Sequence, residues 1–246
     1  MIDVRDFTKN YGTFTATNAI SFTVSPGEVL GLVGPNGAGK TTTLRAIAGI
    51  IAPSAGSISI CGHDIQTSGP KAKQALAFIP DEPQLFDYLT VEEHLRFVAR
   101  LYNVADAEQR LGPILDELEL TDKRRNLPTE LSRGMKQKLA IACGLLHDPQ
   151  ALVLDEPLTG LDPAGMRRMR ATIAARARAG ASVILSSHQL TLVEELCTKL
   201  FVIRHGRCVA YGTLAEIVGT HPELVGRSLE EVFLALTGES GAGSGQ

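Results

Sequence analysis

Short apolar runs alternate with stretches of helical periodicity along this chain. Val29 to Val33, Leu152 to Leu154 and Val183 to Leu185 are strand-sized apolar runs, and each is followed by glycine or polar residues. This alternation is typical of a mostly parallel sheet that is flanked by helices. Ligands of such sheets bind at the carboxyl ends of the strands, so we expect the segments that follow these three runs to meet in space.

Residues 83–147 have a helical pattern. Thr90 and Glu93 have the spacing of a capping box, and apolar residues recur at helical spacing after Met135. We therefore predict an inserted helical subdomain, with the core on either side of it at residues 1–82 and 148–220.

Two further helices are predicted towards the end of the chain. Asp162-Pro163 starts one of them, with proline at the first helical position, and this helix ends near Gly180. Ser228 with Glu231 starts the last helix, which we place at residues 228–237.

The length of the chain suits one large α/β domain. It has 246 residues, of which 44% are hydrophobic. We assign the domain to residues 1–237 and expect the Gly/Ser-rich residues 238–246 to be a disordered tail. Every apolar run is shorter than the roughly 18 residues that cross a bilayer, and the polar start opposes a signal peptide. We therefore expect a cytosolic chain.

Charge and cysteine spacing argue against two classes of function. A formal net charge of -3 gives no general attraction to a phosphate backbone, so we expect no nucleic-acid partner. The cysteines form no CxxC pair and lack the spacing of zinc ligands, which predicts reduced, structural thiols at Cys61, Cys143, Cys197 and Cys208.

A glycine-rich loop follows the first of the three apolar runs. The eight residues from Gly34 to Thr41 fit the pattern GxxxxGK[ST], between a predicted strand and a helix. Glycines let backbone N–H groups point at phosphate oxygens, Lys40 supplies a charge to the β/γ-phosphates, and Thr41 supplies a hydroxyl to Mg²⁺. The structural alternative, a glycine turn with an exposed lysine, does not explain this context. The predicted phosphate-binding residues are Gly34, Pro35, Asn36, Gly37, Ala38, Gly39, Lys40, Thr41 and Thr42.

Two adjacent carboxylates end the second apolar run. Asp155 is placed to hold Mg²⁺, and Glu156 is placed to polarise an attacking water as a general base. Acidic residues at a strand end are also common caps. The upstream phosphate loop favours the catalytic interpretation.

These motifs, together with the segment Leu131 to Gln137, resemble the ATPases of ATP-binding cassette (ABC) transporters over nearly the whole chain. This segment, LSRGMKQ, resembles the signature sequence that separates ABC proteins from other P-loop enzymes. The resemblance implies that Ser132 and Gly134 bind the γ-phosphate of an ATP held by the opposite subunit. An ordinary serine helix cap would have the same local structure.

Weaker matches follow in the order of the family. The resemblance implies that Tyr11 stacks on adenine, that Leu161-Asp162 links the two sites of a dimer, and that His188 touches the γ-phosphate as a catalytic residue. Each has a plain structural alternative: a surface aromatic ring, a helix cap and an isolated histidine.

The sequence departs from the family at two positions. Asp81 stands where most members have a glutamine that contacts Mg²⁺ and the attacking water, so we include Asp81 as a metal ligand that adds charge and is one methylene shorter. Arg133 stands where glycine is usual in the signature.

The resemblance implies a P-loop NTPase of ABC type: an α/β fold with a mostly parallel core sheet, the helical insertion and an N-terminal antiparallel β portion. It implies ATP and Mg²⁺ as cofactors and a head-to-tail dimer with a second ATPase subunit. It also implies a separately encoded polytopic permease at the inner face of the membrane, with a leaning to export. Two alternatives stay open: a soluble ABC ATPase that serves cofactor or complex assembly, and a P-loop kinase or GTPase, which the signature opposes.

Overall fold

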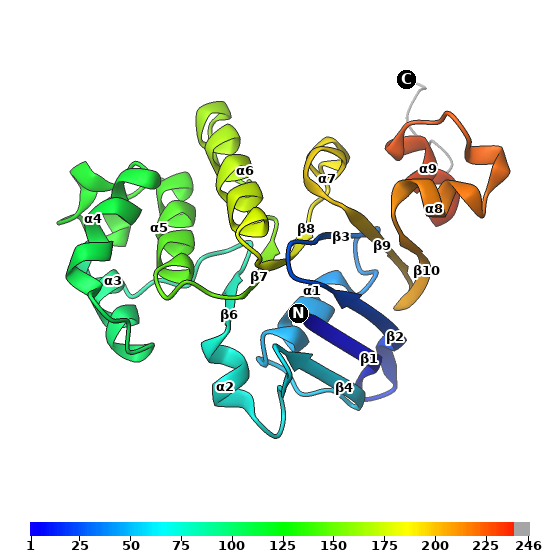
Figure 1. Cartoon of the computed structure of the whole chain (residues 1–246), viewed down its shortest axis with the longest axis horizontal. Helices are drawn as coiled ribbons and strands as arrows, with labels where there is room; N and C mark the ends of the chain where they lie inside the picture. The colour runs from blue at the N-terminus through cyan, green and yellow to red at the C-terminus, as the bar shows by residue number, and fades with distance from the viewer. Residues whose placement is uncertain (239–246) are drawn as a thin grey trace.

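A central sheet of six strands runs through the molecule (Figure 1). The structure is a computed structural model, and it describes residues 1–238. The strand order is β10-β9-β3-β8-β7-β6. The five strands β9, β3, β8, β7 and β6 run parallel to one another, and β10 is antiparallel to β9. The strands are β3 (Val29–Val33), β6 (Leu76–Ile79), β7 (Ala151–Asp155), β8 (Ser182–Ser186), β9 (Lys199–Arg204) and β10 (Arg207–Gly212). The three predicted strands are therefore confirmed as β3, β7 and β8.

The middle strands β3, β7 and β8 are buried at every position because both faces of the sheet are covered. On β7, Leu152 and Leu154 pack in the cluster that contains the helices of residues 91–145, whereas Ala151 and Val153 pack in the cluster on the other face. Since successive side chains of a strand point to opposite faces, a continuous apolar run is what a doubly covered strand requires.

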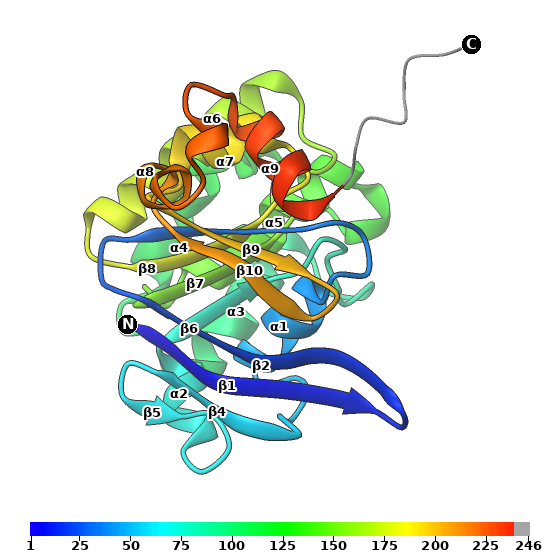
Figure 2. The same cartoon turned by 90° about the vertical axis from the view of Figure 1, so that its right-hand side faces the viewer.

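A second sheet covers one of these faces. Its strand order is β2-β1-β4-β5, and all of its pairs are antiparallel. Figure 2 shows this sheet on one side of the central sheet, with α6 to α9 on the other. Its apolar side chains, such as Phe7 and Ile20, share one buried cluster with α1. The bounds are β1 (Ile2–Tyr11), β2 (Phe14–Val24), β4 (Ala55–Ile60) and β5 (His63–Asp64).

The helices predicted after residue 160 begin at the predicted caps. Asp162 Oδ1 accepts a hydrogen bond of 2.9 Å from Gly165 N–H, and Ser228 with Glu231 forms a capping box. Three other short elements, α7, α8 and η3, were missed because seven or fewer residues give too few turns for a periodic pattern. The bounds are α1 (Lys40–Ile47), α2 (Gly69–Gln74), α6 (Pro163–Arg178), α7 (Leu190–Leu196), α8 (Leu214–Gly219), η3 (Pro222–Leu224) and α9 (Leu229–Thr237).

The last helix, α9, ends just before the last described residue, Gly238. Gly238 caps the end of α9 at φ 65, and the rest of the predicted tail, 239–246, lies outside the described residues. Within residues 1–238, no helix has both the length and the apolar character that a bilayer span requires.

Residues 91–145 form a helical segment at the side of the sheet that ends with β6 (Figure 1). Its elements are α3 (Val91–Leu101), α4 (Ala107–Glu117), η1 (Thr121–Lys123), η2 (Pro128–Glu130) and α5 (Arg133–Leu145). The predicted capping box is confirmed, because Glu93 N–H donates to Thr90 Oγ1 and Thr90 N–H donates to Glu93 Oε2. The subdomain boundaries at 83 and 147 stay a prediction.

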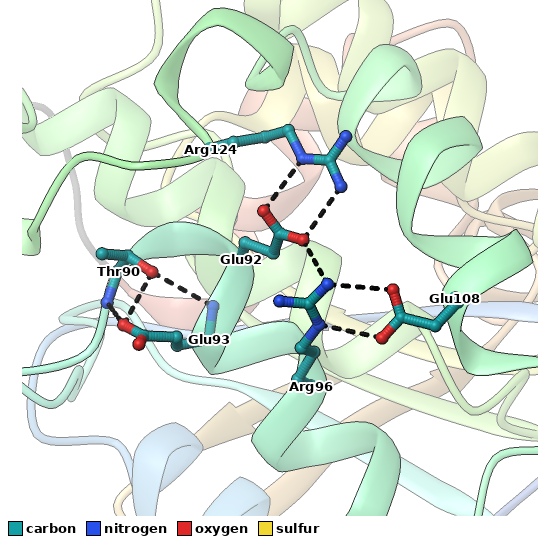
Figure 3. A network of polar contacts seen from close by, with 6 residues as sticks. All are labelled: Thr90, Glu92, Glu93, Arg96, Glu108 and Arg124. Atoms are coloured by element: carbon teal, nitrogen blue, oxygen red, sulfur yellow. Dashed lines mark hydrogen bonds and ion pairs between the residues drawn. The ribbon is translucent and has the colours of Figure 1, made fainter.

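A polar network ties the first turn of α3 to its neighbours (Figure 3). Arg124 donates to both carboxylate oxygens of Glu92, at 3.2 and 3.0 Å. Arg96 contacts Glu92 at 2.7 Å and Glu108 of α4 at 2.8 Å. Glu92 therefore holds two guanidinium groups from different parts of the segment, and its side chain is 17% exposed.

We expect Glu92→Ala to lower the thermal midpoint by about 2–4 °C, because it leaves two arginines facing each other without their shared carboxylate. Salt should shrink this loss, since it screens exposed charges. The control is Glu194→Ala on α7, a carboxylate with no ion pair within the described chain. Equal midpoints for the two variants in low salt would contradict the role of the network.

Candidate active site

Polar residues follow four neighbouring strands of the central sheet and meet around one cavity. The parallel register places Asp155 beside Ser186 and Leu154 beside Ile79, so the loops after β6, β7 and β8 open at the same edge as the loop after β3. A cavity of about 720 Å³ lies there. Its lining contains the predicted residues Asn36, Gly37, Gly39, Lys40, Thr41, Thr42, Asp81, Asp155, Glu156 and His188.

The glycine loop between β3 and α1 needs glycine for two reasons. Gly37 and Gly39 have φ of 77 and 111, a region that side chains disfavour. A Cβ at Gly34 would lie 2.2 Å from the carbonyl oxygen of Ile203, so only glycine allows β9 to approach this closely. A Cβ at Gly37 would meet nothing within 4 Å, which leaves its backbone open towards the cavity.

The remaining residues of the loop fix its shape. Ala38 is buried and donates its N–H to Pro35 O at 3.2 Å. Lys40 Nζ donates to Gly34 O at 2.6 Å and to Pro35 O at 3.0 Å, so the ammonium group lies over the loop at the start of α1. Gly34, Pro35 and Ala38 therefore shape the loop without lining the cavity.

Asp155 ends β7 as a buried carboxylate, 6% exposed. Ser186 Oγ, from the neighbouring strand, donates a short hydrogen bond to its Oδ1. This bond orients the carboxylate towards the cavity that Thr41 also lines. Ser186 was not predicted as a site residue, although its position at the end of an apolar run was a signal.

Glu156 and His188 face each other across the cavity edge. His188 Nδ1 lies 2.8 Å from Glu156 Oε2. Burial raises the pKa of Glu156 above its usual range, and repulsion from Asp155 adds to this, whereas His188 opposes it. Glu156 also has φ of 50, which is unusual for a residue with a side chain and is a form of strain found at functional sites. A carboxylate with a raised pKa is suited to accept a proton from water.

The residues at this edge fit a magnesium ion that is shared with a nucleotide. Within residues 1–238, no cluster of three or more His, Cys, Asp or Glu side chains could hold a metal ion by itself. Mg²⁺ is usually held by one or two carboxylates together with phosphate oxygens and water. Asp155 and Thr41 provide such a partial set, and the Oδ1 atom of Asp81 is buried without a hydrogen-bond partner among the described residues.

The signature segment starts α5 next to this cavity but does not line it. Ser132 is the N-cap of α5, and its Oγ accepts a hydrogen bond of 3.3 Å from Met135 N–H. A Cβ at Gly134 would lie 2.5 Å from the carbonyl oxygen of Gly160, so the helix start packs tightly on the loop after Glu156. Neither Ser132 nor Gly134 lines the cavity of its own chain.

Two aromatic residues flank the turn between β1 and β2. Tyr11 and Phe14 are directly paired across Gly12-Thr13, and both side chains are exposed. Phe14 lines the cavity, whereas Tyr11 does not and instead lies under Lys9 Nζ at 5.2 Å from its ring centroid. Sequence reasoning selected Tyr11 and missed Phe14, although a two-residue hairpin turn would have placed them opposite each other.

The sequence pattern of the ABC transporter family matches residues 17–159, which hold the phosphate loop, the signature and Asp155-Glu156. The chain belongs to the ABC transporter family. It is an ATP-binding ATPase subunit of that family, and the predicted recognition, fold class and enzyme class are confirmed.

Relatives and a solved structure match this ABC ATPase over most of its length. It is 34% identical to the ABC-type transporter ATP-binding protein EcsA of Bacillus subtilis (strain 168), covering 97% of each chain. It is 37% identical to the Nod factor export ATP-binding protein I of Paraburkholderia xenovorans (strain LB400), over 92% of this chain and 74% of that one. A solved ATP-binding subunit of an ABC transporter superposes with a TM-score of 0.92 at 36% identity, covering 96% of this chain and 99% of the other.

We expect Phe14→Ala to weaken ATP binding at least about fivefold, because stacking of a base on an aromatic ring contributes about 1–3 kcal/mol. Tyr11→Ala should weaken binding less, since Tyr11 lies outside the cavity wall. Titration of each purified variant with a fluorescent ATP analogue measures both effects. A larger loss in Tyr11→Ala than in Phe14→Ala would restore Tyr11 as the main adenine contact.

Proposed function

We propose that this chain hydrolyses MgATP at the cavity after β3, β6, β7 and β8, and that it uses the energy to drive export through a separately encoded membrane permease. The observation that carries the proposal is the meeting of Lys40, Asp155 and the Glu156–His188 pair around one cavity. The names of the relatives, which are transporter ATP-binding proteins, support the transport role, and one of them is an export protein.

Each residue has a chemical role in the proposed hydrolysis. Lys40 and the loop N–H groups hold the β/γ-phosphates, and Asp155 with Thr41 would hold Mg²⁺, which neutralises phosphate charge when it is bound. Glu156 accepts the proton of the attacking water. His188, 68% exposed in its side chain, lies beside Glu156, where its ring orients the carboxylate and can also reach a phosphate oxygen.

The second half of the site is proposed to come from another copy of an ABC ATPase. Ser132 and Gly134 do not line their own cavity, yet the start of α5 presents a helix N-terminus that favours an anion. Placed on the opposite subunit, this helix start would meet the γ-phosphate. Because ATP would then touch both subunits, it would favour the closed dimer over separate chains.

We expect Glu156→Gln to bind MgATP, to hydrolyse it about 10²–10⁴ times more slowly, and to accumulate as a dimer. The amide keeps nearly the same size but cannot accept the proton. Size-exclusion chromatography with MgATP and a phosphate-release assay measure the two effects. Turnover at the wild-type rate would contradict the assignment of Glu156 as the base.

Adding Ser132→Arg to Glu156→Gln should abolish the dimer, because a bulky cation would fill the surface that meets the opposite nucleotide. The matched control is Ser228→Arg in the same background, which removes an equivalent N-cap from α9. We expect this control to remain a dimer. Loss of the dimer in both variants would assign the effect to helix capping.

The permease is proposed to dock in a groove between the core and the helical segment. A cavity of about 760 Å³ lies there, and exposed apolar side chains from both parts line it. Ile50 is 59% exposed, Phe97 45% and Leu101 64%, and Phe86 packs edge-to-face on Phe97 at 5.4 Å. A contiguous apolar patch on a monomer often marks an interaction site, and a short amphipathic helix of the permease fits such a groove. The chain would then lie at the inner face of the membrane.

We expect Leu101→Glu to release the chain from membranes of its source cells while its affinity for ATP stays unchanged, because a charge is placed in the apolar groove. The matched control is Val225→Glu, at an apolar residue that is 70% exposed and directly follows η3. The segment η3 contacts α8, which Figure 1 shows at the opposite end of the molecule from the helical segment. Sedimentation of the tagged chain with the membrane fraction is the measurement. Wild-type chain found wholly outside that fraction would favour the assembly ATPase instead.

A further inference from the structure

The two departures from the family sequence lie next to each other in the fold. Asp81 follows β6, and Arg133 is the first residue of α5. Arg133 Nη2 lies 3.8 Å from Asp81 Oδ1. A family member with glutamine and glycine at these positions could not form this ion pair, so the two departures create a contact between the loop after β6 and the signature helix.

The stem of Arg133 is held in place by a third segment. A Cβ at Gly160 would lie 3.0 Å from Arg133 Cγ and 3.1 Å from Cδ, so the side chain runs over the bare backbone of this glycine. Gly160 has φ of 80 in the loop after Glu156. Arg133 therefore touches the loops that follow β6 and β7, and it belongs to the helix that carries the signature.

Asp81 occupies the boundary between the two cavities. It lines both the ATP cavity and the apolar groove. Its side chain is 48% exposed, and that of Arg133 is 62% exposed. An ion pair this exposed changes an equilibrium by no more than about fivefold, which is too little to hold the fold together but suits a contact that breaks and forms again.

We propose that Arg133 is a positioning residue that holds Asp81 in the nucleotide-free chain, and that Asp81 exchanges Arg133 for the magnesium side of the nucleotide when MgATP binds. This inference rests on the proposed function. The Oδ1 atom has no hydrogen bond among the described residues, and the Arg133 guanidinium at 3.8 Å is its ion-pair partner there. One carboxylate cannot satisfy both cations in full at the same time, so the two states compete.

Through this exchange, nucleotide binding in one chain changes the contacts of the signature helix of the same chain. When Asp81 leaves, Arg133 loses its partner while its stem stays on Gly160. The charge at the start of α5 is then free to interact across the dimer. By linkage, removal of the Arg133 charge must favour the MgATP-bound state, because nothing then competes for Asp81.

The test compares nucleotide affinity with and without the metal. We expect Arg133→Gln to bind a non-hydrolysable ATP analogue about two- to fivefold more tightly in Mg²⁺, and with wild-type affinity in EDTA. Glutamine keeps part of the stem that covers Gly160. Isothermal titration calorimetry measures both affinities, and Arg133→Lys, which keeps the charge, should stay near wild type.

Two further variants separate exchange from a structural effect. Arg170→Gln breaks another ion pair, with Glu195 at 2.6 Å, and should change neither affinity. In an Asp81→Asn background, Arg133→Gln should have no further effect, because the competing carboxylate is gone.

The outcomes are distinct. Unchanged affinity of Arg133→Gln in Mg²⁺, an equal gain in EDTA, or a gain that persists beside Asp81→Asn would each overturn the exchange. A wild-type chain that fails to bind the analogue in Mg²⁺ would overturn the proposed function as well. A wild-type chain that binds it, beside an unresponsive Arg133→Gln, would overturn this inference alone.

Discussion

The site depends on one constraint, the parallel register of β3, β8, β7 and β6 in a sheet that is covered on both faces. Parallel strands end at the same edge, so the loops that follow them are forced together. The side chains along these strands are apolar because both faces are buried, which leaves the strand ends as the nearest places for charge. The short hydrogen bond from Ser186 to Asp155 joins two of these ends directly.

Strain and burial at this edge serve chemistry more than stability. Glu156 adopts a positive φ and has a raised pKa because it is partly buried beside Asp155. Both features are unfavourable for the fold alone, and the packed sheet beneath them maintains them. The glycine loop also serves the site, since Gly34 allows β9 to approach and Gly37 leaves its backbone open towards the cavity.

The helical segment lies next to this edge and lines the apolar groove, and Asp81 lines both cavities. Its internal order comes from buried leucines and from the Glu92 network, whereas its link to the loop after β6 includes the exposed Arg133–Asp81 pair. The segment packs on the central sheet through one buried apolar cluster, and the exposed ion pair can break and form again while this packing stays in place. This arrangement suits a subunit whose nucleotide state must change the adjacent, proposed docking surface.

Sequence alone determined the elements with strong local signals. The apolar runs predicted β3, β7 and β8, and the caps at Thr90, Asp162 and Ser228 predicted where helices begin, because capping depends on residues three positions apart. The glycine loop and the Asp155-Glu156 pair were also predicted, since their spacing follows from phosphate and metal chemistry. The roles of single residues in that chemistry remain predictions.

Only the tertiary structure decided contacts between residues that are far apart in the chain. It placed Phe14 in the cavity wall and Tyr11 outside it, put Ser186 against Asp155, and brought Arg133 to Asp81. Local sequence has no signal for these contacts, because they depend on how separate loops pack over the sheet. The sequence determined which groups the site has, and the packing of the loops decided which of them face one another.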